Sequence, residues 1–176
     1  MNIKKTVIIG ILAAIICILA PLSVPAGAIP ISLSTFAVYI VSCTVPKKYS
    51  VPAVAVYILL GAIGLPVFSS FTGGIQSLAG YTGGYIIGYI PCAFLIGLFT
   101  DKYPDRKNIY PLSMIAGTVI CYLFGTLWYM HKAEIGFVNA AAVCILPFII
   151  GDIIKIAVAS ATGITLKTRL RKFISE

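Results

Sequence analysis

Residues 49–100 contain no charged side chain. Soluble domains carry about 25% charged residues, whereas this chain has 10% charged and 60% hydrophobic residues. Its mean hydropathy is +1.04. One helical crossing of a membrane takes about 20 apolar residues, so the uncharged stretch must hold two crossings with a connection between them. The chain is therefore predicted to be an all-α integral membrane protein.

Charged connections and proline or glycine breaks divide the chain into six predicted spans. They form one six-helix membrane domain, residues 1–176, with spans at residues 6–24, 29–45, 51–64, 81–99, 108–130 and 137–166. The first span also fits a signal peptide, because it has a basic start and is followed by small residues. Further apolar blocks follow it, so a first membrane helix is the preferred interpretation. Pro147 is expected to kink the last span.

The lysines and arginines lie mostly on one side of these spans. An even number of spans puts both termini on that side, together with the connections after spans two and four. Eleven of the thirteen cations fall there: Lys4, Lys5, Lys47, Lys48, Lys102, Arg106, Lys107, Lys167, Arg169, Arg171 and Lys172. The opposite side has only Lys132, and Lys155 lies within the membrane. The positive-inside rule therefore places both termini in the cytoplasm, and no basic face of a soluble fold remains for nucleic acid.

Residues 65–80 would connect the third and fourth spans on the outside. Pro66 and three glycines argue against a continuous helix there. Non-helical backbone at membrane depth persists only where it is buried in protein or lines a cavity. We predict an outside lid that folds back over the bundle, sealed by Phe68 and Phe71, with Gln76 offering amide hydrogen bonds. A plain solvated loop is the alternative.

The last span contains an acid and a base, Asp152 and Lys155, in a run that is otherwise uncharged from Gly136 to Leu166. A charge at the centre of a membrane helix costs roughly 2.5–3.5 kcal/mol on insertion scales, so such residues normally pair and face a cavity or the bundle interior. At a spacing of i, i+3 they share one helix face. That face suits a small uncharged ligand head with both N–H and C=O groups. A structural ion pair that locks two helices together is the alternative.

The sequence has no candidate residues for disulfide bonds, nucleotide hydrolysis or metal binding. The five cysteines lie in apolar runs without a CxxC motif, so we interpret them as free buried thiols. Neither a Walker motif nor clustered metal ligands are present, and no cofactor or metal is expected. The chain resembles a binding subunit that depends on other proteins for energy, and no catalytic residue is assigned.

Small residues at Gly10 and Ala14 lie one turn apart in the first predicted span. Such pairs let another helix approach closely. The start of the second span, residues 29–35, carries hydroxyl groups that either face the bundle interior or bond back to their own backbone.

Five sequence blocks together resemble a known family. They are IPISLSTFAV at residues 29–38, LLGAIGLPVF at 59–68, GG at 73–74, GYTGGY at 80–85 and PFIIGDIIK at 147–155. In this order they resemble the BioY family, the biotin-specific S-components of energy-coupling factor (ECF) vitamin importers. The resemblance implies a six-helix S-component in the prokaryotic plasma membrane. It also implies biotin as ligand, and a membrane coupling protein and two ATP-binding-cassette ATPases as partners.

The resemblance also implies roles for particular residues. Asp152 and Lys155 would face the polar head of the ligand, and the small-residue face with Gly10 and Ala14 would dock the coupling protein. The ring and chain of biotin are expected to pack on an aromatic side chain, for which the candidates are Phe71, Tyr39 and Tyr85.

Three positions depart from the pattern of the family. Its members often have Gln where Ser34 stands and Pro where Tyr81 stands, and some have a basic residue near Thr72 that would meet the valerate carboxylate. The predicted lid has no cation. The remaining candidates for binding the ligand carboxylate are Gln76, backbone N–H groups and hydroxyl groups.

Three classes of function remain open at this point. The first is an S-component, for biotin or another small vitamin, that performs no chemistry. The second is a membrane enzyme or a proton-coupled small-solute carrier that uses Asp152 and Lys155. The third is an assembly subunit in which this pair is an interhelix lock.

Overall fold

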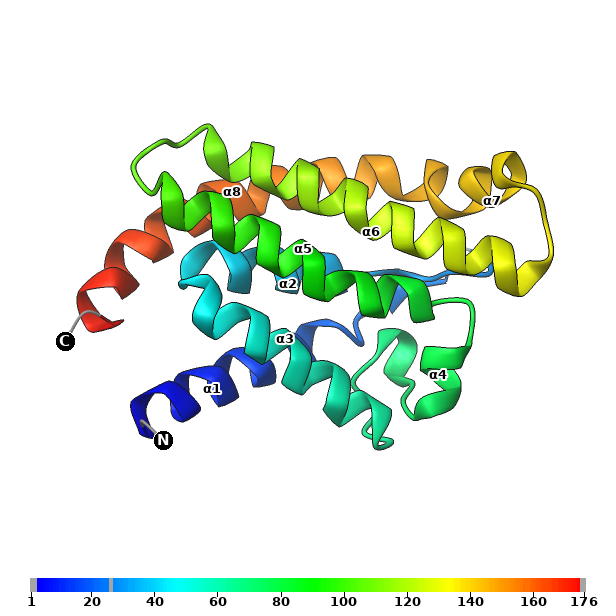
Figure 1. Cartoon of the computed structure of the whole chain (residues 1–176), viewed down its shortest axis with the longest axis horizontal. Helices are drawn as coiled ribbons and strands as arrows, with labels where there is room; N and C mark the ends of the chain where they lie inside the picture. The colour runs from blue at the N-terminus through cyan, green and yellow to red at the C-terminus, as the bar shows by residue number, and fades with distance from the viewer. Residues whose placement is uncertain (1–2, 26, 175–176) are drawn as a thin grey trace.

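The protein is a bundle of helices in which short irregular elements gather at one end (Figure 1). The structure is a computed structural model. It describes residues 3–25 and 27–174, with side chains up to residue 169. The long helices are α1 (Ile3–Leu19), α2 (Ser34–Thr44), α3 (Lys47–Ala62), α5 (Gly83–Lys102), α6 (Ile109–Ala133) and α8 (Leu146–Ile174). The short elements are β1 (Ser23–Val24), β2 (Ile31–Ser32), the 3-10 helix η1 (Ser69–Phe71), α4 (Ile75–Ala79) and α7 (Phe137–Cys144).

The two ends of the bundle differ in charge and in backbone. Both termini lie at one end in Figure 1, beside the α2–α3 turn and the α5–α6 connection, and α4 and α7 lie at the other end. The terminal end therefore contains the segments that carry most of the cations. Arg171 and Lys172, which were counted among them, have side chains outside the described part of the chain. This arrangement agrees with the topology that the positive-inside rule gives.

Helices α5, α6 and α8 have the length and apolarity needed to cross a membrane, over Gly83–Lys102, Ile109–Ala133 and Leu146–Arg169. Helix α2 is apolar but has only 11 residues, about 16 Å of helix. It begins at Ser34, whereas the predicted span begins at residue 29. The cause is the pairing of residues 31–32 with residues 23–24 in a short antiparallel hairpin, which holds the start of the predicted span in extended backbone.

The last predicted span is divided into two helices. The chain breaks at Ile145, between α7 and α8, so Pro147 becomes the second residue of α8. A proline in the first turn of a helix removes only an N–H group that has no intrahelical partner. The expected kink is therefore a helix boundary just before the proline.

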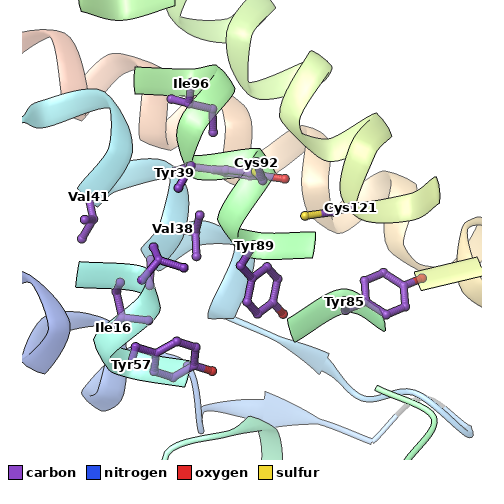
Figure 2. Close-up of a cluster of buried hydrophobic side chains, with 14 of the residues drawn as sticks. Ile16, Val38, Tyr39, Val41, Tyr57, Tyr85, Tyr89, Cys92, Ile96 and Cys121 are labelled. Carbon is purple, nitrogen blue, oxygen red and sulfur yellow. The ribbon is translucent and has the colours of Figure 1, made fainter. Parts of the chain in front are cut away.

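Helices α5 and α6 pack closely along their length, and two glycines make this possible. A Cβ atom on Gly84 of α5 would lie 2.5 Å from the Phe124 carbonyl oxygen of α6, and one on Gly125 of α6 would collide with the ring of Tyr85. Aromatic side chains fill the adjoining core, where Tyr39, Tyr57, Tyr85 and Tyr89 are buried (Figure 2). Their hydroxyl groups bring polar atoms into a membrane bundle.

The cytoplasmic end is held by a partly buried ion pair. Lys167 of α8 is 3.4 Å from Asp101 of α5 and donates a 2.8 Å hydrogen bond to the Thr100 carbonyl. The other carboxylate oxygen of Asp101 accepts the backbone N–H of Lys47, the first residue of α3, at 2.9 Å. One carboxylate thus caps α3 and pairs with a cation of α8, which joins three helices.

Replacing Asp101 should separate these two contributions. Asp101→Ala removes the acceptor of the Lys47 N–H and the ion-pair partner of Lys167, so it should lower the free energy of unfolding by about 1–3 kcal/mol. Asp101→Asn keeps an acceptor for the Lys47 N–H and should lose less. The measurement is the apparent melting temperature of the detergent-purified protein. Asp105→Ala, which removes an exposed carboxylate from the adjacent loop, is the matched control and should change little.

Candidate functional site

Asp152 and Lys155 lie on the inward face of α8. The Lys155 Nζ atom is 3.0 Å from Asp152 Oδ1, and the two side chains are 11% and 4% exposed. Their spacing of three residues on a helix makes them neighbours. A buried pair of this kind needs further hydrogen bonds, because the attraction between the charges does not by itself repay the loss of water.

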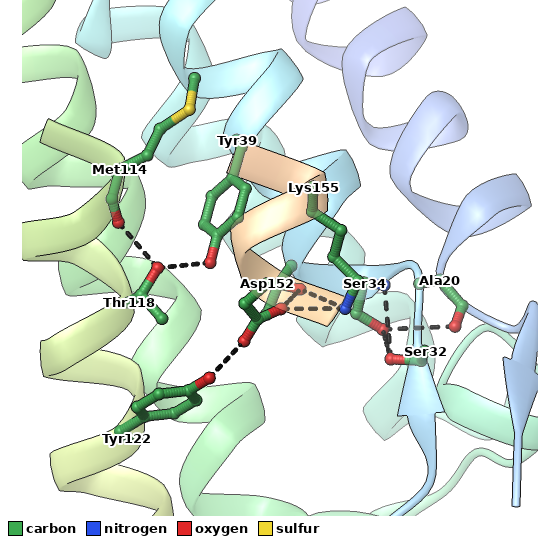
Figure 3. A network of polar contacts seen from close by, with 10 residues as sticks. Ala20, Ser32, Ser34, Tyr39, Met114, Thr118, Tyr122, Asp152 and Lys155 are labelled. Atoms are coloured by element: carbon green, nitrogen blue, oxygen red, sulfur yellow. Dashed lines mark hydrogen bonds and ion pairs between the residues drawn. The ribbon is translucent and has the colours of Figure 1, made fainter. Parts of the chain in front are cut away.

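Two other helices supply those hydrogen bonds. Thr35 of α2 donates to Asp152 Oδ1 at 3.2 Å and accepts from Lys155 Nζ at 3.1 Å. Tyr122 of α6 donates to Asp152 Oδ2 at 2.7 Å (Figure 3). Residues from α2, α6 and α8 therefore form one polar network, which we call the Asp152 network: Thr35, Tyr122, Asp152 and Lys155.

The Asp152 network lines a cavity with an aromatic wall. Its volume is about 30 Å³, far below the usual range of about 300–1,000 Å³ for small-molecule sites, so side chains nearly fill it in this structure. Tyr85, Tyr89 and Phe148 also line it, and the rings of Tyr85 and Phe148 lie 6.1 Å apart between centroids. The cavity thus combines a few polar groups with flat apolar surfaces.

A wider outer groove adjoins this cavity. Its volume is about 710 Å³, and it lies between the β1–β2 hairpin and residues Ser70 and Phe71. Ser32 and Lys155 line both the cavity and the groove. The two spaces therefore meet at these two residues.

Four of the predicted ligand residues lie at these two spaces. Asp152, Lys155 and Tyr85 line the inner cavity. Phe71 lines the outer groove and is 65% exposed, so it lies at the entrance and away from the polar network.

The other four predicted ligand residues have different environments. Tyr39 is fully buried and its hydroxyl is hydrogen-bonded to Thr118. Ser34 is buried and donates to the Ala20 carbonyl at 3.2 Å. Gln76 and Thr72 are exposed and line neither space, and the Thr72 hydroxyl donates to the Ser69 carbonyl. In this structure none of the four reaches the cavity.

Thr35 and Tyr122 were not predicted individually. Thr35 belongs to the hydroxyl-rich start of the second span. The sequence indicated that hydroxyl groups of residues 29–35 face the interior or their own backbone, but it did not distinguish Thr35 from the neighbouring serines. Tyr122 lies in a long apolar helix and its hydroxyl becomes a signal only once α6 is placed beside α8. Among the described residues, no group of three or more His, Cys, Asp or Glu side chains is arranged to hold a metal ion.

The predicted lid, residues 65–80, is folded against the bundle. Phe68 is buried and its ring packs edge-on against Tyr57, 5.6 Å between centroids. Phe68 therefore anchors residues 65–80 to the bundle, whereas the sequence predicted that Phe68 seals the lid over the site. Ser69 lines the inner cavity. At the far end of the segment, the Trp128 indole N–H donates to the Gly80 carbonyl at 2.9 Å.

The tip of this segment has an unusual backbone. Ser70 and Phe71 both have positive φ angles, 59° and 56°, a region that side chains with a Cβ rarely adopt. The conformation is held from the β1–β2 side, because the Ser70 N–H is within 2.9 Å of the Ser23 hydroxyl and 3.1 Å of the Pro21 carbonyl. Such strain persists where surrounding contacts determine it, and it is common at ligand clamps.

Gly10 and Ala14 lie on the exposed face of α1. A Cβ atom on Gly10 would have no neighbour within 4 Å, and the apolar side chains of Val7, Ile11 and Ile18 are exposed around it. Helix α1 packs on α3 and α2, so this face lies away from the cavity. It is open to another helix or to lipid.

The fold and the site define a helical membrane protein with a narrow, polar, aromatic-walled cavity near one end, which opens beside a wider outer groove. A model of the BioY family matches residues 1–172. The chain belongs to the BioY family.

Individual relatives agree with this assignment. The chain is 41% identical over 161 residues to the biotin transporter BioY of Thermotoga maritima, covering 90% of this chain and 92% of the relative. It is 33% identical over 171 residues to a probable biotin transporter BioY of Pyrococcus horikoshii, covering 97% and 98%. A crystal structure of the S-component for biotin from an ECF-type ABC transporter superposes with a TM-score of 0.86, at 27% identity over 98% of this chain and 94% of that chain. These matches confirm the predicted fold class, an all-α multi-pass protein of the cell membrane.

Removing single hydroxyls from the Asp152 network should destabilise the protein without ligand. Tyr122→Phe and Thr35→Val each remove a hydrogen bond to a buried carboxylate, so each should lower the free energy of unfolding by roughly 1.5–3 kcal/mol. The apparent melting temperature in detergent measures the change. Tyr81→Phe, at a half-exposed tyrosine outside the network, is the control. Unchanged melting of both variants would mean that Lys155 alone satisfies the carboxylate.

Proposed function

We propose that this chain is the biotin-capturing S-component of an ECF-type ABC importer, and that the Asp152 network binds the ureido ring. The observation that carries the proposal is the buried set of donors and acceptors at the aromatic cavity, in a chain of the BioY family. The protein binds its ligand at the outer face and leaves it chemically unchanged.

The ureido ring of biotin has two N–H donors and one C=O acceptor. The carboxylate of Asp152 can accept from the N–H groups, and Lys155, Thr35 or Tyr122 can donate to the carbonyl. In this structure these groups satisfy one another at 2.7–3.2 Å. Biotin would replace hydrogen bonds within the network by hydrogen bonds to the ring, so no polar group need be left unsatisfied.

The remaining parts of biotin fit the other surfaces. Its apolar tetrahydrothiophene ring would pack on Tyr85, Tyr89 and Phe148 of the cavity wall. The valerate chain would run past Lys155 into the outer groove, where Phe71 covers it. The Ser23 and Ser70 hydroxyls also line the groove, and we propose them as partners of the carboxylate in place of Gln76 and Thr72.

The chain depends on partners for transport. A membrane coupling protein and two ABC ATPases would supply the energy, and we propose that the α1 face with Gly10 and Ala14 docks the coupling protein. Gly10 and Ala14 have small side chains and are exposed, as a close contact with another helix requires. The relatives are biotin transporters by name, which favours biotin over another vitamin and over a proton-coupled carrier.

Biotin binding tests the function, and a double variant tests the site. Replacing one member of the ion pair would leave an uncompensated buried charge, so the informative variant is Asp152→Asn with Lys155→Gln, which removes both charges and keeps the shape. We expect at least a 100-fold loss of biotin affinity by titration calorimetry, corresponding to about 2.7 kcal/mol. Retained binding by this folded double variant would identify the pair as an interhelix lock.

Ligand analogues sharpen the same test. Iminobiotin replaces the ureido oxygen by a protonated nitrogen and should bind weakly beside Lys155, whereas desthiobiotin keeps the ureido group and should bind well. Absence of binding to biotin itself by the wild-type protein would refute the substrate. Mass spectrometry of the co-purified small molecule would then identify the vitamin.

The docking proposal predicts an effect on assembly alone. Ala14→Trp places a large side chain on the exposed α1 face, so it should reduce co-purification with the coupling protein and the ATPases by roughly tenfold or more. Biotin affinity of the isolated subunit should stay within twofold of wild type, because α1 does not line the cavity. Val119→Trp, on the exposed face of α6, is the control for added bulk. Normal assembly of Ala14→Trp would place the docking face elsewhere.

A further inference from the structure

A second apolar groove lies at the cytoplasmic end of the bundle, between the end of α5 and the start of α6. Phe99 and Tyr103 form one side, and Leu112, Ile115 and Ala116 form the other. The space between the atoms is about 520 Å³, part of it open. The side chains of Leu112 and Ile115 are 61% and 49% exposed, so the groove faces away from the bundle.

The groove offers almost no polar group to an occupant. Its one hydroxyl side chain besides tyrosine, Ser113, donates to the Tyr110 carbonyl of the preceding turn at 2.8 Å. An occupant of the groove therefore needs an apolar body. The groove lies on a membrane-spanning hairpin, and the acyl chain of a lipid has this chemistry.

Two cations are positioned at the mouth of the groove. Lys102 Nζ lies 5.4 Å and the Arg106 guanidinium 5.5 Å from the centre of the Tyr103 ring, and the same ring forms part of the groove wall. Cations over a tyrosine face within about 6 Å are attracted to it. The tyrosine thus connects an apolar groove to a pair of positive charges.

The connection that carries these cations is held in shape by hydrogen bonds. The Tyr103 N–H donates to the Phe99 carbonyl at 3.0 Å, and the Arg106 N–H donates to the Tyr103 carbonyl at 3.3 Å. The Tyr110 hydroxyl donates to the Pro104 carbonyl at 3.0 Å. The backbone that carries the cations is therefore fixed, and the Tyr103 ring is the contact that draws their side chains to the groove.

The charge balance favours an anionic head group. The connection contains Lys102, Arg106 and Lys107 against Asp105. The other nearby carboxylate, Asp101, is used by Lys167 and by the backbone N–H of Lys47. The positive-inside rule places this end of the bundle at the cytoplasmic leaflet, and basic pockets between membrane helices on that side bind anionic lipid head groups.

We propose that the α5–α6 groove is a binding site for one anionic phospholipid. An acyl chain lies in the groove against Leu112 and Ala116, and the phosphate is held by Lys102 and Arg106. The site is separate from the biotin cavity, at the opposite end of the bundle.

The test is a lipid titration of the delipidated full-length protein by native mass spectrometry. Dioleoylphosphatidylglycerol should bind more tightly than dioleoylphosphatidylcholine, which has the same chains but no net charge. The double variant Lys102→Gln with Arg106→Gln should bind phosphatidylglycerol about 30-fold more weakly, the loss expected for two cations near an anionic head group at about 1 kcal/mol each. Lys48→Gln is the matched control, because Lys48 also lies over a tyrosine ring, Tyr49, at 5.1 Å, but that ring does not line the groove.

Two groove variants test the acyl chain. Leu112→Trp and Ala116→Leu fill the groove and leave both cations in place, so each should weaken phosphatidylglycerol binding by tenfold or more. Glycerol 3-phosphate, the soluble head, should not compete. Biotin affinity, measured on every variant, should remain at the wild-type value and shows that the bundle is folded.

Several results would overturn the proposal. Equal binding of the two lipids, or equal losses in Lys48→Gln and the double variant, would mean a general cationic surface. Competition by glycerol 3-phosphate would mean a phosphate site without a groove. Loss of the coupling complex in the groove variants with unchanged lipid binding would mean that a protein helix occupies the groove.

Discussion

The paired charges of Asp152 and Lys155 are removed from water, and the arrangement of the bundle follows from satisfying them. A single helix cannot do this, because its own backbone hydrogen bonds are already used and its neighbouring side chains are apolar. Helix α2 brings the Thr35 hydroxyl and α6 brings the Tyr122 hydroxyl to the same carboxylate. The close packing of α5 on α6, made possible by Gly84 and Gly125, sets the aromatic wall beside this network. The same contacts that stabilise the buried pair therefore also form the walls of the cavity.

The two ends of the bundle solve different physical problems. The ligand end contains irregular backbone, which is stable there because the hairpin, η1 and α4 are folded against the helices. The cytoplasmic end contains regular helix termini, and Asp101 satisfies the first N–H of α3 while it pairs with Lys167. The Asp152 network and the Asp101–Lys167 pair are therefore separated along the length of the molecule. A change at one end can be measured with the other end as an internal control.

Much of this was accessible from the sequence because it depends on local composition. Charge-free runs predicted membrane helices, and the spacing of Asp152 and Lys155 predicted a shared face. The remaining parts depend on which helices are neighbours. Tyr39 and Tyr122 are both tyrosines in apolar helices, but only Tyr122 faces the carboxylate, and nothing in the local pattern distinguishes them.

The helix boundaries in the structure differ from the bounds of the predicted spans for the same reason. The start of α2 at Ser34 depends on strand pairing with residues 23–24, and the break at Ile145 precedes the proline that suggested it. Gln76 and Thr72 were chosen for their chemistry, but the turn that carries them points their side chains to the exposed surface. Chemistry selects candidate residue types, and the tertiary arrangement decides which of them meet.

The chain has a single tryptophan, and its indole N–H is hydrogen-bonded to the Gly80 carbonyl, where the outside segment joins α5. Indole emission depends on hydrogen bonding and on local polarity. The protein therefore carries a built-in optical reporter at the junction of residues 65–80 with α5. A movement of this segment on ligand binding would change the emission, and stopped-flow fluorescence of the unlabelled protein would follow it in real time, in detergent or in a bilayer.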